Sequence, residues 1–92
     1  MKKVYDWNVE LLVHIDNNNK KILIVCSVHT TVHALKLEIC KKMGYLLFDT
    51  EIDLYGGKET WRPMKPTSSL QQNGIDRSQT RIKAVVKRVK KN

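Results

Sequence analysis

The order of the local patterns along this 92-residue chain limits the folds that it can adopt. Residues 9–15 alternate apolar and other side chains, as a half-buried strand does. The Asp-Asn-Asn-Asn run at 16–19 favours a chain reversal, and residues 21–28 form a second, β-branched segment. We therefore expect a β-hairpin. Its predicted core face carries Val9, Leu11, Val13, Ile15, Ile22, Ile24 and Cys26, and its other face Leu12, Leu23, Val25 and Ser27.

One amphipathic helix is predicted after the hairpin. Thr30 or Thr31 is a suitable N-cap, and Gly44 is a suitable C-terminal stop. Between them, apolar side chains recur at steps of three and four residues, which places them on one stripe of a helix of three to four turns. The stripe consists of Val32, Leu35, Ile39 and Met43.

The second half of the chain predicts two more strands and little other regular structure. Residues 52–55 form a short strand that Gly56-Gly57 stops, residues 61–69 form a loop with both prolines, and residues 70–75 suit a turn of 3₁₀ helix. Arg81 to Val89 reads as the final strand. The predicted fold class is therefore α+β: a mixed sheet of four to five strands with one helix packed across it.

Size and cysteine usage set further limits. A chain of this length builds one core, so we expect an N-terminal arm at 1–8, one domain at 9–89 and a basic tail at 90–92. Cys26 and Cys40 show no metal-ligand spacing, and the three histidines are widely separated. We expect free thiols, no metal or cofactor, no catalytic site, no membrane contact, and a cytoplasmic or nuclear location.

The charge is strongly positive, with 17 Lys and Arg against nine Asp and Glu and a formal net charge of +8. Such a balance favours acidic partners, nucleic acid or anionic headgroups, or serves solubility alone. The cations gather near the two ends of the chain. The cluster consists of Lys83, Lys87, Arg88, Lys90 and Lys91, with Lys2 and Lys3 at the other terminus.

Several short motifs, in their order, resemble ubiquitin-like domains of the β-grasp fold over residues 9–89. They are the T-V-x-x-L-K-x-x-I pattern at 31–39, Gly44, Leu-Tyr-Gly-Gly-Lys at 54–58, and the Leu-to-Asn-Gly-Ile segment at 70–75. Conjugated members of that family end in Gly-Gly, where this sequence reads Lys90-Lys91-Asn92. The resemblance therefore implies a non-conjugating module that binds other proteins.

The family also suggests where a partner binds. Members use an apolar patch on the outer face of the sheet, and the resemblance places Leu54 and Val85 near two of its positions. Leu12, Leu23 and Val25 offer an alternative outer surface, unless they pack beneath the loop. That loop is longer than in ubiquitin and supplies Lys58, Trp61, Arg62 and Met64 as candidate contacts, although Trp61 also suits a core plug.

Two functions from different classes follow. The first is a monomeric interaction module that binds a protein, such as a ubiquitin-pathway or complex-assembly component, through the outer sheet face. The second is RNA binding through the basic C-terminal cluster, although no aromatic platform accompanies it. The Asp-Leu-Tyr-Gly run at 53–56 additionally resembles ubiquitin-fold domains of cytoskeletal or tubulin-folding factors.

Overall fold

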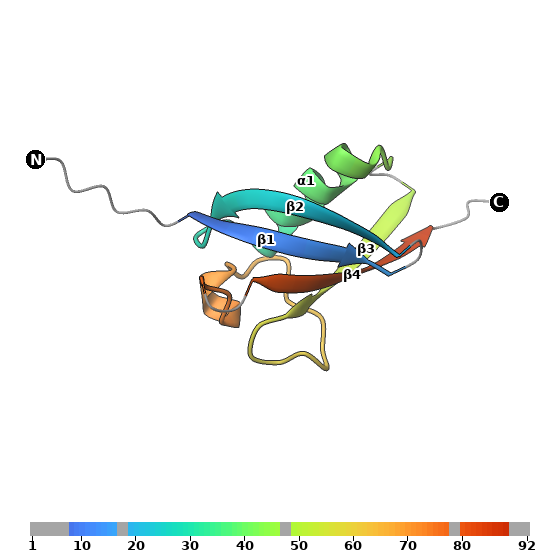
Figure 1. Ribbon diagram of the computed structural model, residues 1–92. Coiled ribbons are helices and arrows are strands. Elements are labelled where there is room, and N and C mark those ends of the chain that lie inside the picture. Colours follow the sequence, from blue (N-terminus) through green and yellow to red (C-terminus); the bar gives the residue numbers. More distant parts are fainter. Residues whose placement is uncertain (1–7, 17–18, 47–48, 78–79, 89–92) are drawn as a thin grey trace, which may run out of the picture.

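The computed structural model describes residues 8–16, 19–46, 49–77 and 80–88 (Figure 1). Within these residues the elements follow the predicted order, and only their ends differ by a residue or two. They are β1 (Asn8–Ile15), β2 (Lys20–Ser27), α1 (Val32–Met43), β3 (Thr50–Gly56), the 3₁₀ turn η1 (Gln71–Asn73) and β4 (Arg81–Arg88). Of the predicted arm at 1–8, Asn8 begins β1, and residues 1–7 lie outside the described residues, as do Val89 and the tail at 90–92.

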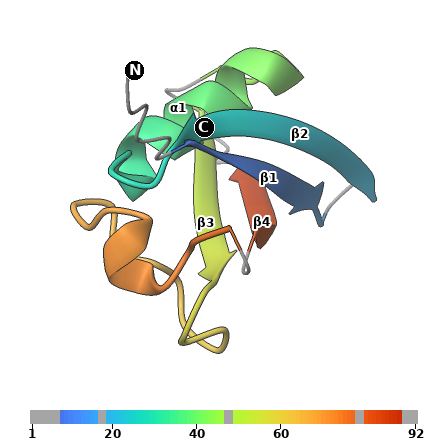
Figure 2. The same ribbon diagram turned by 60° about the vertical axis from the view of Figure 1, so that its left-hand side comes forward.

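The four strands form one mixed sheet in the order β2-β1-β4-β3. β1 pairs antiparallel with β2 and parallel with β4, while β3 pairs antiparallel with β4. The helix α1 crosses one face of this sheet and leaves the other face open (Figure 2). The predicted α+β class, with one helix packed across a mixed sheet, is confirmed.

The core lies between the sheet and α1, and the period-two pattern of the strands builds it. Every second residue of β1, from Val9 to Ile15, is buried, as the alternation predicted. The helix contributes the predicted stripe and also Cys40, which is buried one residue after Ile39. Thr31 is the N-cap, since its hydroxyl accepts a hydrogen bond from the backbone N–H of Ala34.

The long connection from β3 to β4 is fastened to the rest of the domain by backbone hydrogen bonds. Met64 N donates to Leu54 O over 2.8 Å at the open edge of β3, and Leu70 N donates to Thr30 O over 2.9 Å. Leu70 and Ile75 are fully buried on either side of η1, as predicted. The part of this connection that follows β3 and precedes Met64 extends beyond β3 and β4 (Figure 1).

Candidate functional site

The open face of the sheet carries the side chains that α1 does not cover. In each strand these are the residues that alternate with the core positions, so their identity follows from the register. This outer face has an apolar part, which we call the outer patch: Leu12, Leu23, Val25, Tyr55 and Val85.

Leu23 and Val25 are the most exposed members of the outer patch. Their side chains are 55% and 60% exposed, although both lie in the middle of β2. Leu12 is the register partner of Leu23, and it is half-buried. The predicted alternative surface on this face is therefore present, and Leu23 and Val25 do not pack beneath the loop.

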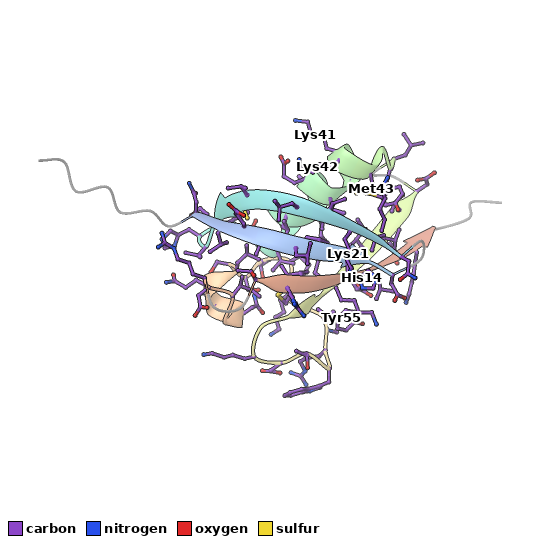
Figure 3. The ribbon with its side chains drawn as sticks, viewed as in Figure 1. His14, Lys21, Lys41, Lys42, Met43 and Tyr55 are labelled. Atoms are coloured by element: carbon purple, nitrogen blue, oxygen red, sulfur yellow. The ribbon has the colours of Figure 1, made fainter. Side chains whose placement is uncertain are left out.

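A row of polar and aromatic side chains crosses all four strands beside these residues. His14 in β1 pairs in register with Lys21 in β2 on one side and with Lys83 in β4 on the other. Lys83 in turn pairs with Tyr55 in β3. Neighbouring strands are about 4.8 Å apart, so long side chains of such a row reach one another. Figure 3 labels His14, Lys21 and Tyr55, which come from three different strands.

A hollow of about 470 Å³ lies over this row, and we call it the basic hollow. Arg81, the register partner of Leu12, also borders it, and so does Thr60 from the long loop. The nine lining residues include no carboxylate. They are Leu12, His14, Lys21, Tyr55, Gly56, Thr60, Arg81, Ile82 and Lys83.

The polar side chains of the basic hollow differ in their partners. Lys83 Nζ lies 3.7 Å from Asp16 Oδ1, and both side chains are about half exposed. His14 Nε2 lies 3.0 Å from Asn19 Oδ1, which holds the imidazole against the hairpin turn. Lys21 and Arg81 form no ion pair or side-chain hydrogen bond with any residue of the described ranges. Two cations in the hollow are therefore available to an anionic ligand.

The prediction of a surface contact is wrong for two residues, Leu54 and Met64, because both side chains are buried. Leu54 is 0% exposed and faces α1, because it lies on the same side of β3 as Ile52 and Gly56, which are also buried. The outward residues of β3 are Glu51, Asp53 and Tyr55 instead. Met64 is 5% exposed, because its backbone bond to Leu54 seats the side chain in the core.

The other predicted contact residues lie at the surface, but they do not form one cluster. Val85 is half-buried on the outer face. Lys58 and Arg62 are exposed on the long loop, where Arg62 Nε lies 3.4 Å from Glu59 Oε2. Trp61 is 72% exposed, so it is not the core plug that the sequence allowed.

The basic C-terminal cluster is only partly within the described residues. Lys83 and Lys87 are exposed on the outer face of β4, and Lys87 has Glu51 as its register partner across the strand pair. The backbone of Arg88 ends β4. Lys90, Lys91 and the N-terminal Lys2 and Lys3 lie outside the described residues.

Both cysteines are free, and burial raises the pKa of each thiol above its ordinary value of 9.0. At Cys26 the charge of Glu38 raises the pKa further, while a hydrogen bond with Thr30 opposes the shift. Among the described residues, no three His, Cys, Asp or Glu side chains gather as metal ligands would. No helix in the described ranges has the length and apolar character needed to cross a membrane.

Sequence reasoning missed the basic hollow as a unit. The outward positions of each strand were readable from the alternation, and Leu12, Leu23 and Val25 were recognised in that way. The row through Lys21, His14, Lys83 and Tyr55 depends on the register between β1 and β4, which are distant in sequence. The sequence holds no local signal for that parallel register.

Comparison with known proteins identifies solved structures that have a similar fold. No family model matches the chain, and no curated protein matches it by sequence. Among solved structures, the ubiquitin-like domain of yeast Ddi1 is similar at 14% identity, with a TM-score of 0.63 over 98% of this chain and 99% of that one.

Two further structures are similar over most of their length. A ubiquitin-like domain from tubulin-binding cofactor B matches at 18% identity with a TM-score of 0.59, covering 85% of this chain and 88% of that one. The RA domain of a guanine nucleotide exchange factor for Rap1 matches at 11% identity with a TM-score of 0.59, covering 100% of this chain and 85% of that one. These likenesses confirm the predicted ubiquitin-like β-grasp fold.

Proposed function

We propose that this ubiquitin-like β-grasp domain is a non-conjugated, non-enzymatic module that binds a protein partner through the outer face of its sheet. The observation that carries the proposal is the exposure of Leu23 and Val25, at 55% and 60%, in the middle of a regular strand. Both have a β-sheet scaffold beneath them, so a partner meets them in a fixed position.

The physical argument is the gain from covering apolar surface that water now contacts. Burial of such surface contributes roughly 25 cal/mol per Å², and apolar residues fixed on a rigid element lose little further freedom on binding. Leu12, Tyr55 and Val85 extend the same surface across β1, β3 and β4. An aromatic and aliphatic centre bordered by Lys and Arg has the composition of a protein interface.

The comparisons support the class of function. Ubiquitin-like folds serve widely as protein-interaction modules, and the similar structures include named domains of this kind. We infer that the partner is a ubiquitin-pathway or complex-assembly component, met in the cytoplasm or nucleus by a monomer of this protein.

Several carboxylates on the outer face count against the RNA alternative. Glu10, Asp53 and Glu51 lie on this face, at register positions opposite Val25, Val85 and Lys87. A phosphate backbone laid along the sheet would meet these charges as well as the lysines. A protein partner with mixed charge avoids that conflict.

The test compares proteins captured from a cell lysate by three forms of the tagged protein. They are the wild type, a Leu23→Ser, Val25→Ser double variant, and a Leu37→Ser control, in which an exposed leucine of α1 is changed. We expect the double variant to lose a partner that the wild type and the control retain, with about tenfold weaker binding once that partner is purified. A partner that binds all three forms equally would overturn the proposed surface.

A further inference from the structure

We propose that the basic hollow binds a phosphoryl group carried by a side chain of the protein partner. This inference rests on the proposed function, because it assigns the partner's chemistry at the same outer face. The hollow combines cations, hydroxyl donors and an apolar wall in one place. Lys21, Arg81 and Lys83 supply the cations, Tyr55 and Thr60 supply the hydroxyls, and Leu12 supplies the apolar wall together with the ring of Tyr55.

The charge balance favours a dianion over a single carboxylate. Asp16 contacts Lys83 at 3.7 Å, whereas Lys21 and Arg81 have no ion-pair partner among the described residues. The hollow therefore presents two uncompensated positive charges. A phosphorylated side chain carries about −1.5 to −2 charges at neutral pH and three strong acceptor oxygens, so it matches both the charge and the donors.

The size of the hollow favours a phosphorylated side chain over a free anion. Its volume of about 470 Å³ exceeds what one phosphate group fills, and part of its wall is apolar. The body of a phosphorylated residue would lie against Leu12 and Tyr55 while its phosphoryl group meets the cations. The adjoining Leu23 and Val25 then receive neighbouring residues of the same partner.

The carboxylates of the outer face favour a peptide over a membrane or RNA. Asp53 lies two positions from Tyr55 in β3, and Glu10 lies two positions from Leu12 in β1. An anionic bilayer or a continuous phosphate backbone would approach these groups together with the cations. A single phosphoryl group in the basic hollow would meet a lining that contains no carboxylate.

The test titrates the full ¹⁵N-labelled chain with acetylated pentapeptides of Ala and Gly that hold a central phosphotyrosine or phosphoserine, and with their unphosphorylated forms. We expect phosphorylated peptides alone to shift the amides of Lys21, His14, Lys83 and Tyr55. A Lys21→Ala, Arg81→Ala variant should bind about tenfold more weakly or worse, since each change removes a charge-assisted bond. Thermal unfolding of the variant checks that it remains folded.

The matched control is a Lys41→Ala, Lys42→Ala variant, which removes the same net charge from exposed positions at the end of α1 (Figure 3). Equal losses in both double variants would overturn the proposal, because they indicate attraction to net charge alone. Equal binding of phosphorylated and unphosphorylated peptides would overturn it too. So would saturable binding of a twelve-nucleotide oligo(U) or of phosphatidylserine vesicles at the hollow without any effect of the phosphopeptides.

The two proposals fail separately. A protein partner that requires Leu23 and Val25, but binds the Lys21→Ala, Arg81→Ala variant normally, removes the phosphoryl inference and keeps the proposed function. Phosphopeptides that occupy the basic hollow, while no protein depends on Leu23 and Val25, remove the proposed function and the partner assignment with it.

Discussion

At the scale of single residues, the alternation of side chains along a strand decides whether a residue lies in the core or at the surface. Leu54 and Tyr55 are neighbours in β3, yet Leu54 is fully buried and Tyr55 borders the basic hollow. The resemblance to ubiquitin-like domains suggested Leu54 for the surface, one residue away from the outward position. A shift of one residue along a strand exchanges the two faces, so motif matching alone does not fix such an assignment.

A substitution pair tests this correction. We expect Leu54→Ala to lower the free energy of unfolding by about 3 kcal/mol, because it removes a fully buried side chain and leaves a cavity. Leu23→Ala should change that free energy by less than about 0.5 kcal/mol, because its side chain is 55% exposed. Urea denaturation followed by circular dichroism measures both. Similar losses in the two variants would contradict the assigned faces.

The two thiols give a pH-dependent prediction. Burial raises the pKa of Cys40, and burial with the nearby Glu38 charge raises that of Cys26 against a weaker opposing bond from Thr30. The folded state therefore holds both protons more tightly than the unfolded state. Their contribution to stability is complete below the unfolded pKa, near 9.0, and is lost as the pH rises through the higher folded pKa.

We accordingly expect the wild type to lose stability above about pH 9 more steeply than a Cys26→Ala, Cys40→Ala variant. Urea denaturation between pH 7 and 10 measures the two slopes, and the variant controls for the titration of lysines. Iodoacetamide should also modify the folded thiols more slowly at pH 8 than an unfolded reference. Identical slopes, with thiols that react as fast as the reference, would show that neither pKa is raised.

At the scale of elements, the sequence predicted most of the fold because each element has its own local signal. Alternation defined β1 and β2, the stripe from Val32 with Thr31 and Gly44 defined α1, and Asn73-Gly74 defined η1. Positions at element ends were less certain, as in β3, which begins at Thr50 rather than Ile52. Pairing beyond the hairpin had no such signal, and the basic hollow depends on it.

The turn after β3 shows how one element is locked to another. Gly57 has a φ of +73°, and a Cβ built there would overlap the carbonyl oxygen of Asn73. The same carbonyl accepts a hydrogen bond from Lys58 N over 2.9 Å, so the glycine allows the turn to approach η1 closely. The Gly-Gly-Lys run therefore has a structural role in joining β3 to η1.

The matched pair Gly57→Ala and Gly44→Ala separates contact from conformation. Gly44 has the same φ of +73° but no atom within 4 Å of its built Cβ. We expect Gly44→Ala to cost about 1 kcal/mol of stability from backbone strain alone, and Gly57→Ala to cost about 3 kcal/mol because the clash adds to it. Thermal unfolding measures the difference. Equal costs would mean that the turn has room for a side chain.

At the scale of the whole molecule, the fold places one covered and one open face on the same sheet. The covered face and α1 hold the apolar core, and the open face combines the outer patch with the basic hollow. Residues from all four strands and the long loop line that hollow. No single segment of the sequence encodes it, which is why composition revealed only a net positive charge. The strand order β2-β1-β4-β3 brings positively charged residues from separate segments together in one hollow.

The central claim is that the open face of the sheet binds the partner, and methyl NMR tests it most directly. The protein is labelled at its Leu and Val methyl groups and titrated with the partner captured by the wild type. We predict that the methyl signals of Leu12, Leu23, Val25 and Val85 shift on binding, while those of the exposed Leu37 on α1 stay in place. Shifts at Leu37 with none at the four sheet residues would contradict the account.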